Sequence, residues 1–80
     1  MFKRKIKSVA IVSVTAERKL GFSVPAQEKV KLFSYNTTKK ALEKEWKKEG
    51  LQAVAKMLPN QNVLSIDKVE FARLDGKELI

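Results

Sequence analysis

The chain has 80 residues and contains neither cysteine nor histidine, which removes several classes of chemistry. Zinc sites of the usual kinds need thiolate or imidazole ligands, and neither is present. Cys–His dyads and Ser–His–Asp triads are excluded for the same reason. No disulfide can form either, so the fold must be stabilised by burial alone. A lack of cysteine is typical of a cytoplasmic protein, and we expect that location.

Glycine, proline and acidic residues are also scarce. The three glycines stand far apart, so there is no glycine-rich loop to hold a nucleotide phosphate. Only nine residues are acidic. Glu43, Glu45 and Glu49 lie among lysines, which favours surface charge over a catalytic pair of carboxylates. We therefore expect no enzymatic activity, no metal and no cofactor.

Long hydrophobic runs are missing as well. No stretch approaches the roughly 18 apolar residues that a membrane-spanning helix needs, so we expect no membrane partner. Apolar residues still make up 44% of the chain, enough for one small core. We expect residues 1–80 to form a single domain, near the lower size limit for folding without disulfides or metals. Self-association, for example as a homodimer, would bury more surface and is also expected.

Alternating apolar residues predict the β-strands. Residues 5–15 have apolar side chains on both faces around residues 9–12, which predicts a central strand covered on both faces at its middle. Residues 20–24 and 28–35 alternate as well, and residues 25–27 form either a turn between two strands or a bulge within one. The apolar alternation within residues 63–74 changes parity partway along the strand. Leu64 and Ile66 share one parity, and the apolar residues that follow have the other. A bulge near residues 67–68 would reconcile the two halves.

Between these strands, the helical period runs from the capping residues 36–38 to Leu58. Leu42 and Trp46 fall on its apolar side. Gly50 either interrupts one helix or ends a first helix before a second, and we favour one helix or two nearly collinear ones. The order β-β-(β)-α-β predicts an α+β fold. Its architecture is a small three- or four-stranded sheet, antiparallel or mixed, with one main helix packed on one face.

The net charge of +8 is distributed unevenly along the chain. The first 35 residues carry eight Lys or Arg and only two acids, and residues 36–58 carry six lysines and three acids. Residues 59–80 are close to neutral. Such asymmetry favours contact with an anion along one side. The alternative is a solvated surface that keeps a small domain soluble.

The basic start of the chain is the main functional indication. In an extended strand, Lys3, Lys5 and Lys7 share one face, with Arg4 beside them. A row of this kind suits an evenly charged polyanion, because lysines neutralise phosphates without reading a sequence.

Two further groups of residues support this interpretation. Phe33 and Tyr35 follow two lysines on one strand face, where they could stack bases, although packing into the core is the alternative. The helical lysines lie together on one flank. The complete candidate nucleic-acid site comprises Lys3, Arg4, Lys5, Lys7, Lys29, Lys31, Phe33, Tyr35, Lys40, Lys44 and Lys47.

The layout resembles small proteins of Firmicute phages and mobile elements, including the phage early histone-like proteins that bind duplex DNA. The likeness rests on Lys3-Arg4-Lys5-Ile6-Lys7, Thr38-Lys39-Lys40-Ala41-Leu42 and Val63–Phe71. The acidic C-terminal tail common in such proteins is missing here. The resemblance implies DNA contact at the basic N-terminal cluster alone.

These observations predict a non-enzymatic accessory protein that binds nucleic acid largely independently of sequence, DNA rather than RNA. The competing hypothesis is a phage or mobile-element interaction or inhibitor module that occupies an acidic surface of a host protein. An exposed strand edge, or the apolar pair Phe71 and Leu74, would then dock the partner.

Overall fold

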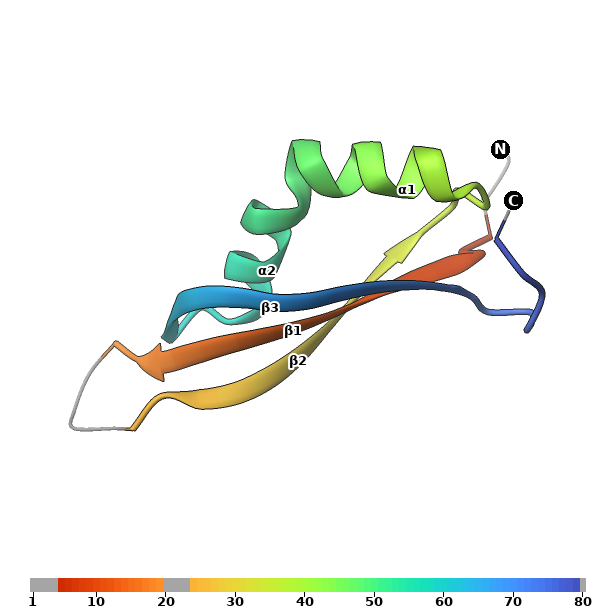
Figure 1. The fold of residues 1–80 in the computed structure, drawn as a ribbon. Helices are drawn as coiled ribbons and strands as arrows, with labels where there is room; N and C mark the ends of the chain where they lie inside the picture. The colour runs from red at the N-terminus through yellow and green to blue at the C-terminus, as the bar shows by residue number, and fades with distance from the viewer. Residues whose placement is uncertain (1–4, 20–23, 80) are drawn as a thin grey trace.

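The computed structural model describes residues 5–19 and 24–79. Their elements are β1 (Ser8–Arg18), β2 (Ala26–Ser34), α1 (Lys39–Glu45), the π-helical segment η1 (Trp46–Gly50), α2 (Leu51–Met57) and β3 (Gln61–Arg73). The three strands form one antiparallel sheet in the order β2-β1-β3, and the helical segments cover one of its faces (Figure 1). The predicted α+β fold is confirmed. Most of the strand expected over residues 20–24 lies outside the described residues.

The core lies between β1 and the helical segments. Every second residue of β1 from Ala10 to Ala16 is buried, and Val12 pairs with Val30 on one side and Val69 on the other. Val54 of α2 completes this cluster. β1 is therefore central, as predicted, but the described helical segments cover only one of its faces. We call the other face of the sheet the open face.

β1 begins at Ser8 rather than at the predicted Lys5. The regular pairing with both neighbours starts at Ser8, opposite Ser34 and Arg73. Lys7 is still held at the end of the sheet, because its N–H donates to the Ser34 carbonyl over 2.9 Å and its carbonyl accepts from the Leu74 N–H over 2.9 Å. Residues 5 and 6 lie beyond this last contact, so Lys5 and Lys7 precede the strand instead of forming part of it.

Two irregularities of β3 explain its change of parity. Ser13 lies opposite Lys68 and the next residue opposite Ile66, so Asp67 is the extra residue of a bulge, as predicted. A second shift, which the sequence pattern did not predict, leaves Leu64 as an extra residue. Leu64 is consequently exposed while Ile66 packs on the core, and the expectation that these two share a face is wrong.

The helical region begins at the predicted cap and is continuous from Lys39 to Met57. Thr38 is the N-cap, and its Oγ1 accepts from the Ala41 N–H over 3.3 Å. Gly50 does not end the helix, but the region bends through η1, so α1 and α2 are not collinear (Figure 1). The π-helical turn accounts for the bend, because it widens the helix locally and interrupts the regular hydrogen-bond ladder.

Candidate nucleic-acid interface

Nine of the candidate residues can be placed, and all nine are exposed: Lys5, Lys7, Lys29, Lys31, Phe33, Tyr35, Lys40, Lys44 and Lys47. Lys3 and Arg4 lie outside the described residues. The nine do not form one surface. They divide into a group at the sheet and a group on the helix.

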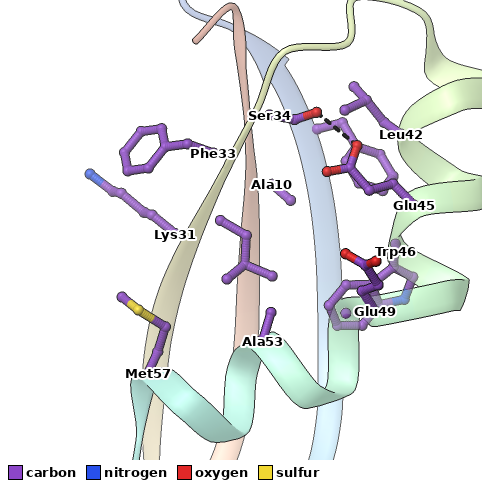
Figure 2. A pocket seen from close by; sticks show the side chains of 13 residues that line it. Ala10, Lys31, Phe33, Ser34, Leu42, Glu45, Trp46, Glu49, Ala53 and Met57 are labelled. Atoms are coloured by element: carbon purple, nitrogen blue, oxygen red, sulfur yellow. Dashed lines mark hydrogen bonds between the residues drawn. The ribbon is translucent and has the colours of Figure 1, made fainter.

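The sheet group lies on the open face of β2 and at the adjoining strand ends. The side chains of Lys29, Lys31 and Phe33 are on the face of the sheet away from the core. These residues pair with the positions of β1 that alternate with its core residues, and neighbouring residues of a strand point to different faces. Figure 2 shows Lys31 and Phe33 pointing away from the helical segments. Tyr35 follows directly after β2, and Lys7 is held at the same end of the sheet by its backbone contacts. Lys29, Lys31 and Phe33 are therefore on the open face, and Lys7 and Tyr35 adjoin it at the strand ends.

The helical group lies on the opposite side. Lys40, Lys44 and Lys47 are spaced by four and three residues, which places them on one flank of the helical region. Leu42 is buried against the sheet, and this spacing turns the lysines away from it. A single ligand lying flat on the open face cannot contact them. The sequence could not reveal this separation, because charge counts along the chain do not say which face the helix covers.

The lysines of the sheet group form no ion pair within the described parts of the protein. The two ion pairs found there are Lys68 with Glu70 and Arg73 with Asp75, both at 2.6 Å. Glu70 lies opposite Ile11, which in turn lies opposite Lys31, so this acid is on the open face near the group. The hydrogen bond and charge of Lys68, and to a smaller extent the charge of Lys29, lower the pKa of Glu70. Glu70 is thus already paired, and the ammonium groups on β2 remain available to an anion.

The two aromatic residues of the group are exposed rather than packed in the core. Phe33 is 55% exposed and Tyr35 is 51% exposed. Val9, which lies opposite Phe33 on the open face, is buried. Much of the Phe33 side chain beside it stays in solvent. Trp46, in contrast, packs against the core as the sequence pattern indicated.

A cleft of about 360 Å³ is a feature that sequence reasoning missed. It lies between β2 and the concave side of the bent helical region, and apolar side chains form most of its lining: Leu32, Leu42, Trp46, Ala53, Met57 and Phe71 (Figure 2). Phe71 therefore belongs to the core side of the sheet and does not form an exposed pair with Leu74. The cleft depends on the bend at η1, for which an isolated glycine was the only sequence signal.

At one end of the cleft, a carboxylate joins the helix to the sheet. Glu45 Oε2 accepts from the Ser34 hydroxyl over 2.8 Å and from Asn36 Nδ2 over 2.7 Å. Ser34 is buried, and its Oγ also accepts from the Asn36 N–H over 3.1 Å. These hydrogen bonds occupy the Glu45 carboxylate, so we assign it a structural role.

No protein-family model matches the chain, and neither a curated protein nor a solved structure matches it. The resemblance to phage proteins stays a prediction. Within residues 5–19 and 24–79, none of the helices is sufficiently long and apolar to cross a membrane. No group of three acidic side chains gathers there closely enough to hold a metal ion.

Proposed function

We propose that this protein is a non-enzymatic accessory protein that binds nucleic acid, with the open face of the sheet as the binding surface. The observation that carries the proposal is the combination of half-exposed Phe33 and Tyr35 with the exposed, unpaired lysines of β2. Phosphates would lie along the lysines, and bases would stack on the two aromatic rings. Lys5 and Lys7, which precede β1, would extend the same surface.

The exposed aromatic residues favour single-stranded nucleic acid over a duplex. Bases that are already stacked in a duplex cannot lie on a protein ring, whereas those of a single strand can. Neighbouring lysines on one strand face are about 6.6 Å apart, a spacing that follows an extended backbone. Backbone contacts of this kind do not read base identity, so binding would be largely independent of sequence.

The test compares two triple variants that remove the same charge from opposite sides of the molecule. One is Lys7→Gln with Lys29→Gln and Lys31→Gln; the matched control changes the three helical lysines of the candidate site to Gln. Binding to labelled oligothymidine of about 16 nucleotides is followed by fluorescence anisotropy. Salt is varied from about 0.05 to 0.2 M. Losing three phosphate contacts should make the slope of log affinity against log salt shallower by about 2.

The control triple should leave this slope close to that of the parent protein. An equal loss in both triples would mean that the net charge alone attracts the oligonucleotide. A larger loss in the helical triple would move the site to the helix. Absence of binding by the parent protein at low salt would refute the proposed function.

A further inference from the structure

β2 is an edge strand that offers a regular template for another strand. Among residues 5–19 and 24–79 it pairs with β1 alone, through nine consecutive residue pairs without a register shift. β3 forms the other edge, but two register shifts interrupt it. Bulges make an edge a poor template, since they break the alignment of its N–H and carbonyl groups. β2 is therefore the edge on which an added strand fits better.

The cleft beneath the bent helix lies directly beside this edge. Four consecutive residues of β2, from Lys31 to Ser34, line it, so the strand's backbone forms part of its border along with the helix-facing Leu32. Met57 projects beside β2 at the rim of the cleft and is 55% exposed (Figure 2). A strand added to β2 would direct every second side chain to the helix side, toward Leu32 and Met57.

Charges determine which side chains suit each side of such a strand. Glu45 and Glu49 stand at the cleft, so acidic side chains on the helix side would be repelled, and apolar ones fit the lining. On the open face, the added strand would run beside Lys29 and Lys31, which attract acidic side chains. We propose that β2 and the cleft bind an extended peptide segment of a partner protein in which apolar and acidic residues alternate.

A second copy of this chain does not suit the edge. Pairing β2 with β2 of another molecule would bring lysines of the two open faces together, and like charges on neighbouring strands are destabilising. A nucleic acid strand would leave the apolar cleft empty, because it lacks a row of apolar side chains. The occupant is thus a peptide that carries negative charge on one side.

The probe is a synthetic blocked peptide of alternating Glu and Val, about seven residues long, within the usual length of a strand. Trp46 is the single tryptophan of the chain and lines the cleft, so its emission reports occupancy there. We expect a saturable shift of this emission and slower amide hydrogen exchange in β2. A peptide with Lys in place of Glu should bind at least about tenfold more weakly.

Two glutamate variants of α2 form a matched pair. Met57→Glu places a charge at the rim of the cleft and should weaken binding of the Glu–Val peptide by at least about tenfold. Leu51→Glu makes the same change in the same element at a residue that is 66% exposed and does not line this cleft. It should leave the affinity within about twofold, as expected of a surface substitution.

Three results would overturn the proposal. The first is an unchanged Trp46 emission and unchanged exchange in β2 at saturating peptide. The second is equal weakening by Met57→Glu and Leu51→Glu. The third is an oligothymidine that shifts Trp46 emission in a way that Met57→Glu abolishes, because the cleft would then hold nucleic acid.

Discussion

The ring of Trp46 lies against Gly50 so closely that a Cβ atom at position 50 would overlap it. The two residues are the first and last of the π-helical segment η1. Gly50 has an ordinary helical backbone, with φ of −59° and ψ of −45°, and it is buried. Glycine is therefore needed at this position for space, not for a special backbone conformation. The close contact thus lies within the bend beside the cleft, which both residues line.

Gly50→Ala should destabilise the fold although alanine favours a helix. The gain in helix propensity is about 1 kcal/mol, but the added methyl group would force the indole ring or the backbone to move. Overpacking costs about 1–3 kcal/mol, so after the gain in propensity we expect a net loss of up to about 2 kcal/mol in the free energy of unfolding, measured by urea denaturation, with altered Trp46 emission. Gln52→Ala, at an exposed helical position, should change it by less than about 0.5 kcal/mol. A more stable Gly50→Ala protein would show that Trp46 yields easily.

Glu45→Ala should loosen the joint between α1 and the end of β2. It removes the acceptor of the hydrogen bonds from Ser34 and Asn36 and leaves the buried Ser34 hydroxyl without that partner. We expect a loss of about 1–3 kcal/mol in the free energy of unfolding. Glu43→Ala, at an exposed position two residues earlier, removes a charge of the same sign and serves as control. Equal losses in both variants would point to helix charge instead of these hydrogen bonds.

The bulge of β3 makes stability depend on acid pH. Asp67 accepts hydrogen bonds from the hydroxyls of Thr15, over 2.7 Å, and Ser65, over 2.8 Å, and these lower its pKa. A carboxyl group whose pKa is lower in the folded state stabilises the fold above its unfolded pKa. That contribution is lost as the pH falls through the lower folded value, hence below about pH 4. Asp67→Asn should therefore give a flatter dependence of stability on pH in this range.

Thr15→Val offers a direct check on this cause. It removes the first of the two donors while keeping the carboxylate, so the pKa of Asp67 should rise toward its ordinary value, followed by NMR titration of the side chain. An unchanged pKa in this variant would mean that the Thr15 hydroxyl does not hold the carboxylate in solution.

Residue periodicity predicted the order of the elements because it reports which side chains share a face. The bulge at Asp67 was predictable, since apolar residues on either side of it change parity. The second shift was not, because Leu64 is apolar and continued the alternation plausibly. Periodicity also cannot say what covers a face: Val9 is buried and Ile11 half-buried, yet the described helical segments lie on the other face of the sheet. Spacing alone also does not reveal that the Trp46 ring lies against Gly50 within the bent segment.

The candidate interface was predictable to a similar degree. Lysines are rarely buried, so the exposure of Lys29 and Lys31 followed from residue type. Alternation could not decide whether Phe33 and Tyr35 lie in the core or in solvent, because both arrangements have the same period. That depends on which face of the sheet the helix covers. The tertiary packing of Leu42 and its neighbours places the helix on the face away from Phe33.

Replacing both exposed aromatic residues should separate base stacking from phosphate contact. Phe33→Ala with Tyr35→Ala should weaken binding of oligothymidine by about 1–3 kcal/mol for each stacked base that is lost. Affinity for a duplex of the same length should change little, and the salt dependence should stay that of the parent, because the lysines remain. Both residues are more than half exposed, so the fold should tolerate the change. Leu64→Ala, an equally exposed apolar residue near the far end of β3, is the control. Equal weakening for single strand and duplex would mean that the rings do not stack on bases, and the lysines alone would then account for binding.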